Sequence, residues 1–162
     1  LIGWLRLLPN ITCLYVNSTE LKYWFMNNRD NQYLNSFFRR IDRLYIDCSP
    51  IINRSLNEEI MEPLLSFVID KHHFPQLQCL RFILCKHILS TWCNIFKWID
   101  FIFAHINEVR LKCLRFDFIE KDQEVTDIKT GDEIIITTEP PYIVDIHRFI
   151  SENHIAFWIE RK

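Results

Sequence analysis

The sequence predicts an α/β fold, a short solenoid in which stacked repeat units place a parallel sheet on one side and helices on the other. An apolar-x-x-Leu-x-apolar pattern occurs four times, and its first positions are 30, 36 and 34 residues apart. A period of this size, with a strand in each copy, is typical of solenoids, whose units bury their apolar faces only by stacking. The segments between the copies carry apolar residues at helical spacing. The four copies are Ile11–Val16, Ile41–Ile46, Leu77–Phe82 and Leu111–Phe116.

A longer phrase opens two of these strands. Leu8–Leu14 and Phe74–Leu80 both read Leu/Phe-Pro-x-apolar-x-x-Leu, and Leu111–Leu114 repeats its end. Over roughly residues 5–118 the chain resembles the leucine-rich-repeat region of F-box/leucine-rich-repeat proteins, the substrate-recognition subunits of ubiquitin ligases. The resemblance implies a leucine-rich-repeat-like solenoid that recruits a protein substrate. It implies a Skp–cullin scaffold as a further partner only if an F-box, which is not recognisable in this sequence, lies upstream.

Length and composition favour a single domain over residues 1–162, with repeats over 1–118 and a degenerate C-terminal cap over 119–162. Hydrophobic residues make up 49% of the chain, which argues against disorder. The formal net charge of −2 gives no electrostatic reason to expect nucleic acid or an anionic membrane surface. The most apolar stretch, 96–106, is too short to span a bilayer. We therefore expect a protein partner, no nucleic acid and no membrane.

The six cysteines lack the density and regular spacing of a disulfide scaffold. Cys13, Cys79 and Cys113 share the third position of the motif, where small, packable side chains fit. We predict that the cysteines are reduced, in an intracellular protein of the cytoplasm or nucleus. No signal peptide is recognisable at the start of the sequence, which favours the same location.

Two short helices are expected after the first strand. Asn17–Thr19 could cap the first of them. Apolar residues at helical spacing occur in 21–25 and again in 34–38, on either side of the polar run 27–31. This pattern predicts two helices separated by a loop.

One helix is expected in each of the next two connectors. Ser55 and Glu58 form a capping-box pattern at the start of the second connector, before an apolar stripe over residues 60–68. Pro63 lies inside that stripe, so the helix either kinks there or begins there. The third connector carries the longest stripe, over residues 92–106, which predicts a helix of about four turns.

The C-terminal part departs from the repeat pattern after a charged loop over residues 120–133. Residues 134–138 predict a strand, 143–150 predict a short helix, and the alternating apolar residues of 155–159 predict a last strand. The last helix and strand together would form a degenerate fifth unit. Its polar outer face would cap the stack, as the terminal repeat of a solenoid must.

Sequence motifs of catalysis and of metal binding are missing. Two glycines are too few for a Walker A loop or a dinucleotide fingerprint, and no Gly-x-Ser-x-Gly, His-Glu-x-x-His or Cys-x-x-Cys occurs. Cys85-x-His87, with Cys93 nearby, is interpreted as a turn, because a structural metal site needs about four convergent ligands. We therefore expect a protein that is not an enzyme, with no metal and no cofactor. A thiol- or metal-dependent hydrolase is the weaker alternative.

The outward positions of the strands form the candidate site. The fifth position of the motif is Tyr in the first two copies and Arg in the last two, and strands about 4.8 Å apart would align these side chains as a ladder on the concave face. Arg81 and Arg115 lie side by side in that ladder, so an acid must offset them, either Asp47, Asp117 or one from a partner. Tyr and Arg are enriched at interaction hot spots. The predicted partner-binding residues are Tyr15, Arg43, Tyr45, Asp47, Arg81, Arg115 and Asp117.

The sequence thus favours a non-catalytic protein–protein interaction module, the substrate-recognition region of an F-box-type ubiquitin-ligase adaptor. A structural repeat fragment, which only packs against neighbouring repeats of a longer protein, is the alternative, and the apolar start over residues 1–5 favours it. The two hypotheses differ in whether the outward strand residues bind a partner.

Overall fold

The computed structural model describes residues 10–27, 31–48, 58–85, 92–105, 110–119, 144–151 and 154–161. In this part of the chain the fold is mixed α/β, with six strands in one sheet and four helices, which confirms the predicted class. The elements follow in the order β1 (Cys13–Asn17), α2 (Ser18–Asn27), α3 (Gln32–Phe38), β2 (Arg43–Asp47), α4 (Glu58–Ile69), β3 (Cys79–Cys85), α5 (Trp92–Ala104), β4 (Cys113–Ile119), β5 (Val144–Ser151) and β6 (His154–Arg161).

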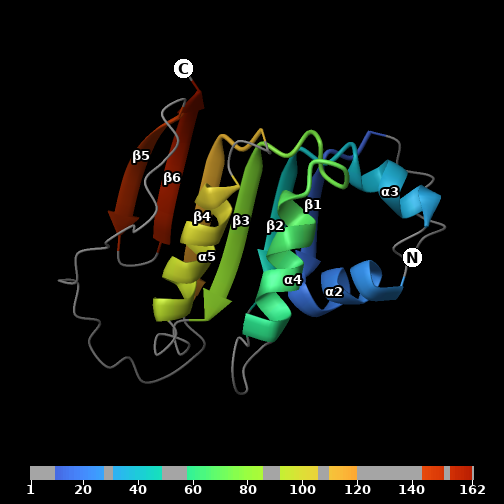
Figure 1. Ribbon diagram of the computed structural model, residues 1–162, viewed down its shortest axis with the longest axis horizontal. Coiled ribbons are helices and arrows are strands. Elements are labelled where there is room, and N and C mark those ends of the chain that lie inside the picture. The colour runs from blue at the N-terminus through green and yellow to red at the C-terminus, as the bar shows by residue number, and fades with distance from the viewer. Residues whose placement is uncertain are drawn as a thin grey trace.

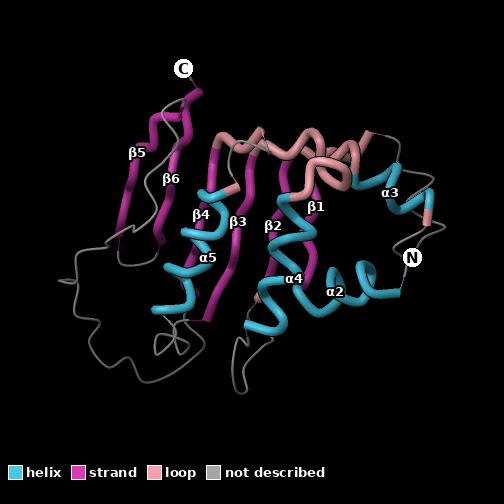
Figure 2. Tube along the Cα trace, viewed as in Figure 1, coloured by secondary structure: helices cyan, strands magenta, loops and turns pink. Residues whose placement is uncertain are grey.

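The six strands are ordered β1-β2-β3-β4-β6-β5 across the sheet. The first four, one from each copy of the motif, are parallel, as predicted. β6 pairs antiparallel with β4, and β5 antiparallel with β6, so the sheet is mixed rather than wholly parallel (Figure 1). The loops that lead from α3 into β2 and from α4 into β3 lie at the same end of the sheet, where these strands begin (Figure 2).

A repeated backbone hydrogen-bond pattern fixes the register of the parallel strands. The carbonyl oxygen of Thr12 accepts from the backbone N–H groups of Asp42 and Arg43, with N···O distances of 2.8 and 3.1 Å. The carbonyls of Asp42 and Gln78, at the same place in the next two copies, each accept from two consecutive N–H groups at 2.7–3.0 Å. Equivalent positions of the four copies therefore lie directly opposite one another.

At the fourth copy the pattern ends on β6. The Lys112 carbonyl stands where a fifth parallel copy would donate, and it instead accepts from the N–H of Ile159 at 2.9 Å. β6 thus takes the backbone groups that a further repeat would use, and it runs in the opposite direction. The sequence predicted a degenerate fifth repeat of one helix and one strand in this region. The described residues instead form two antiparallel strands.

The helix predicted over residues 143–150 is wrong, because residues Val144–Ser151 form strand β5. Ile146 and Ile150 are four residues apart and therefore fit both a helical stripe and the alternation of a strand. The β-branched Val144, Ile146 and Ile150 favour the extended conformation. Phe149, which a helical stripe would bury, is 54% exposed. The strand predicted over 155–159 is confirmed as part of β6.

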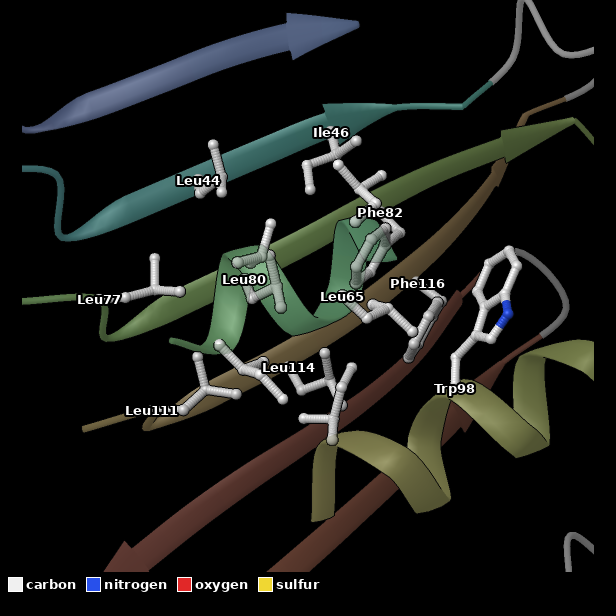
Figure 3. Close-up of a cluster of buried hydrophobic side chains, with 14 of the residues drawn as sticks. Leu44, Ile46, Leu65, Leu77, Leu80, Phe82, Trp98, Leu111, Leu114 and Phe116 are labelled. Carbon is white, nitrogen blue, oxygen red and sulfur yellow. The ribbon is translucent and has the colours of Figure 1, made fainter. Parts of the chain in front are cut away.

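The core lies between the sheet and the helices. The motif leucine is fully buried in the second, third and fourth copies. At the sixth motif position Phe82 stacks on Phe116 with ring centroids 5.2 Å apart, and Trp98 of α5 lies 6.2 Å from Phe82. Figure 3 shows these side chains on the face of the sheet that α4 and α5 cover. Burial of each large apolar side chain contributes about 1.5–3 kcal/mol, so this interface accounts for much of the stability.

Short helices begin where asparagine side chains cap them. The Asn17 side-chain oxygen accepts from the N–H groups of Thr19 (2.8 Å) and Glu20 (3.1 Å), which confirms the predicted cap of α2. Asn31 caps α3 in the same way, accepting from Tyr33 and Leu34 at 3.1 and 3.3 Å. The two helices predicted in this connector are confirmed. Capping matters here because helices this short are marginal alone.

The two longer helices agree with their predicted stripes. α4 begins at Glu58 and continues through the exposed Pro63, so it does not begin at that proline. α5 buries Ile95, Ile99, Ile102 and Phe103 of its stripe, and also Trp98 beside it. No helix in the described ranges combines the length and the apolar character needed to cross a membrane. The strand predicted at 134–138, the capping residue Ser55 and the turn residue His87 lie outside the described residues.

Removal of a motif leucine should destabilise the fold strongly. Leu80 is fully buried in β3, between β2 and β4. We expect Leu80→Ala to lower the free energy of unfolding by about 2–5 kcal/mol, because it leaves a cavity as well as removing apolar contact. Met26→Ala, at an exposed position of α2, is the control and should change it by less than about 0.5 kcal/mol. Urea denaturation measures the free energy of unfolding of both variants. Equal losses in the two variants would contradict the arrangement of the core.

Candidate functional site

The face of the sheet opposite the helices, called the open face here, carries the outward side chains of the strands. No helix of the described chain lies against it. Register aligns its residues in rows that cross the strands. All seven predicted partner-binding residues lie on it. Its residues are Cys13, Tyr15 and Asn17 of β1, Arg43, Tyr45 and Asp47 of β2, Cys79, Arg81 and Ile83 of β3, Cys113, Arg115 and Asp117 of β4, His154, Ala156 and Trp158 of β6, and His147 and Phe149 of β5.

The predicted ladder is present, with Tyr15, Tyr45, Arg81 and Arg115 directly opposite one another on successive strands. The Tyr15 hydroxyl donates a hydrogen bond to the Asp47 carboxylate at 3.1 Å. Desolvation, and then this hydrogen bond, raise the pKa of Tyr15, so the hydroxyl stays protonated and able to donate. The Arg81 guanidinium lies over the Tyr45 ring, 5.5 Å from its centroid, within the range of a cation–π interaction.

Asp117 lies between the two arginines of the ladder, and the three side chains are called the Asp117 cluster. Arg81 Nε donates to one carboxylate oxygen of Asp117, and Arg115 contacts the other through Nε at 2.8 Å and Nη2 at 2.7 Å. The Asp117 residue is buried, although each arginine keeps more than a third of its side chain exposed. One carboxylate therefore offsets the like charges that the register places side by side. The sequence analysis named Asp47 and Asp117 as acids that could offset the two arginines. Asp117 forms the ion pairs with Arg81 and Arg115, while Asp47 accepts the hydrogen bond from Tyr15.

Arg43 lies apart from this cluster, in the row of the cysteines. Its Nε contacts the Asp42 carboxylate at 3.4 Å, with both side chains exposed to solvent. The hydrogen bond to Asp42 is the main reason why the pKa of Arg43 is raised. Arg43 is thus paired with an acid of its own strand region and takes no part in the Asp117 cluster.

Sequence reasoning missed the part of the open face on β5 and β6. Trp158 lies directly opposite Cys113 and is 56% exposed, and Phe149 follows Arg115 and Ala156 along their row. Phe149 also stacks on the His154 ring, with centroids 5.2 Å apart. The helical interpretation of residues 143–150 hid Phe149, and Trp158 was missed because its strand was assigned to a C-terminal cap rather than to the face of the four motif strands. The signal for an antiparallel pair was the spacing of Val144, Ile146 and Ile150, followed closely by the second alternating stretch over residues 155–159.

In the part of the chain that the structure describes, no group of three or more His, Cys, Asp or Glu residues converges to hold a metal ion. No protein-family model, no curated protein and no solved structure matches the chain. The functional inference therefore depends on the open face itself.

Loss of the charge on Asp117 should destabilise the sheet. Asp117→Asn keeps the shape of the side chain but leaves Arg81 and Arg115 adjacent without their shared anion. We expect the free energy of unfolding to fall by about 2 kcal/mol, since charged hydrogen bonds in a buried position are lost. Asp42→Asn, which removes an exposed ion pair, should cost less than about 0.5 kcal/mol. Urea unfolding of both variants gives the comparison, and similar losses would mean that the Asp117 cluster contributes no more than a surface pair.

Proposed function

We propose that this chain is a leucine-rich-repeat-type solenoid that acts as a non-catalytic protein-interaction module through its open face. The observation that carries the proposal is a sheet face that no helix of the described residues covers, on which Tyr, Arg, Trp and Phe side chains occupy aligned rows. Tyr15, Phe149 and Trp158 each expose more than half of their surface there. Exposed aromatic side chains set among charged groups are typical of surfaces that bind other proteins.

The open face is also ordered in advance of binding. Arg81 is held by Asp117 on one side and by the ring of Tyr45 beneath it, and the Tyr15 hydroxyl is held by Asp47. Side chains that are already fixed lose less conformational entropy when a partner docks. Tyr, Trp and Arg are the residue types that most often dominate binding energy.

The resemblance to F-box/leucine-rich-repeat proteins adds a cellular role to this proposal. The module would recruit a protein substrate to a ubiquitin ligase, and would meet the Skp–cullin scaffold only through an F-box upstream of the chain. It would need no cofactor. It would work in the cytoplasm or nucleus, where thiols stay reduced. The four in-register copies and the free thiols of Cys13, Cys48, Cys79 and Cys113 support this assignment.

The test compares exposed aromatic residues on the two sides of the molecule. Tyr15→Ala and Trp158→Ala alter the open face, while Tyr23→Ala removes an equally exposed tyrosine (61% against 59% for Tyr15) from helix α2. The purified chain and its variants are immobilised, and proteins bound from cell extract are quantified by mass spectrometry. Arg81 and Arg115 are less suitable, because their loss disturbs the Asp117 cluster and hence stability.

We expect at least one protein to be retained by the original chain and by Tyr23→Ala but depleted about tenfold or more by Tyr15→Ala or Trp158→Ala. Titration of that purified protein should give a Kd that is about 10- to 100-fold weaker for the open-face variants, the loss that follows removal of a hot-spot aromatic residue. Retention of the same proteins by all four forms would contradict recognition through the open face. Absence of any specific partner would favour the structural repeat fragment.

A further inference from the structure

A pair of cysteines lies on the open face, one row away from the ladder. Cys79 of β3 and Cys113 of β4 are direct partners in the parallel register, and their side chains are hydrogen-bonded to each other. Both are partly exposed. Neighbouring strands are about 4.8 Å apart, within the 4.4–6.8 Å between Cα atoms that a disulfide requires. The two residues are called the thiol pair.

The two thiols differ in acidity. The hydrogen bond from Cys79, aided by the charge of Arg115, lowers the pKa of Cys113 to about 7, against the opposing effects of desolvation and of Asp117. The same hydrogen bond, together with burial, raises the pKa of Cys79, against the charges of Arg43 and Arg81. The lowered pKa favours the thiolate of Cys113, while Cys79 is the proton donor of the hydrogen bond. Thiolates, and not thiols, are the nucleophiles in exchange with disulfides.

We propose that the thiol pair is a reversible thiol–disulfide exchange site for small anionic disulfides, with Cys113 as the nucleophile and Cys79 as the resolving thiol. The Cys113 thiolate attacks one sulfur of the disulfide, forms a mixed disulfide and releases one thiolate. Cys79 then loses its proton to solvent and attacks Sγ of Cys113, which releases the second thiolate. The protein loses two electrons and two protons, and the small disulfide is reduced to two thiols. This inference does not depend on the proposed function.

Charged groups around the pair favour an anionic substrate. Arg43 flanks Cys79 from β2, and Arg81 and Arg115 follow the two cysteines on their own strands. Asp117 offsets part of the charge of Arg81 and Arg115, but the Arg43 side chain keeps about half of its surface exposed. On the β6 side the residue opposite Cys113 is the uncharged Trp158. A disulfide that bears carboxylates, such as oxidised glutathione, suits these surroundings.

Cys13 provides an internal control. It lies in the same row of the open face and is exposed, but the residue opposite it on β2 is Arg43 rather than a cysteine. A small disulfide can reach Cys13, yet no neighbouring thiol can resolve the adduct. If exposure alone decided which thiol reacts with the disulfide, Cys13 would be modified. If a neighbouring thiol is needed, the reaction takes place at Cys113.

Tryptic peptides of this sequence show which cysteine has reacted. Trypsin cleaves after Lys and Arg and places each of the six cysteines in a different peptide, with Cys79 in residues 72–81 and Cys113 in residues 113–115. The full chain is treated with oxidised glutathione at pH 7, the remaining thiols are blocked, and unreduced digests are analysed by mass spectrometry. We expect peptides 72–81 and 113–115 to be joined by a disulfide. The variants Cys79→Ala, Cys113→Ala and Cys13→Ala are treated in the same way.

Cys79→Ala should accumulate a glutathione adduct on Cys113, because the resolving thiol is gone, while Cys13→Ala should form the joined peptide normally. Iodoacetamide alkylation of Cys113 should show a midpoint near pH 7 in the original chain. At pH 7 it should be about tenfold slower in Cys79→Ala, since a thiol without the hydrogen bond returns toward its ordinary pKa of about 8.5.

Preferential modification of Cys13 with no joined peptide would overturn the inference. So would an unchanged alkylation rate at Cys113 in Cys79→Ala. Thermal unfolding followed by circular dichroism shows that each variant is folded before it is tested. If Cys113→Ala proves unfolded, the comparison of Cys79→Ala with Cys13→Ala still decides, because the adduct on Cys113 is the feature that only a resolving pair produces.

Discussion

The parallel register of the four motif strands is the constraint on which both faces of the molecule depend. It is set where each strand begins, by a carbonyl that accepts two consecutive N–H groups of the next copy. The connectors between copies differ in length, with periods of 30, 36 and 34 residues, and yet the register is the same at each junction. Since side chains alternate between faces, a slip of one residue would exchange the buried leucines for the outward ladder. Burial of the apolar face therefore holds the register.

The same register places two positive charges side by side, and Asp117 offsets their repulsion. It aligns the fifth motif position across the copies and so places Arg81 directly opposite Arg115. Because both strands are fixed by the core beneath them, the arginines cannot separate without loss of packing. A carboxylate two residues further along β4 reaches both of them, and burial of that carboxylate strengthens the interaction. The arginines of the candidate site are thus held by the fold rather than by a ligand.

The sequence alone predicted the features that the repeated motif determines. It failed where the spacing of apolar residues fits both a helix and a strand. The strands and the ladder were predictable because the pattern recurs four times, so that each copy supports the others. The acid beside Arg81 and Arg115 was left open between Asp47, Asp117 and an acid from a partner, since contact along a diagonal depends on the twist of the sheet, which no motif encodes. Residues 143–150 were misinterpreted because one short, unrepeated stretch fits both helical and strand spacing. Phe149 was lost from the candidate site by the same ambiguity, and Trp158 because its strand was predicted as part of a cap and not as a neighbour of β4.

Arg115 connects the two chemical features of the open face. It holds Asp117, and its charge also favours the thiolate of Cys113 two residues before it. The rows of the cysteines and of the ladder are separated by two residues along each strand, roughly 6.6 Å. A disulfide between Cys79 and Cys113 would remove the anion that Arg115 faces on one side and leave Asp117 as its nearest carboxylate. The oxidation state of the thiols would then alter the charge next to the ladder, and the usual spacing of neighbouring strands lies within the range that a disulfide requires.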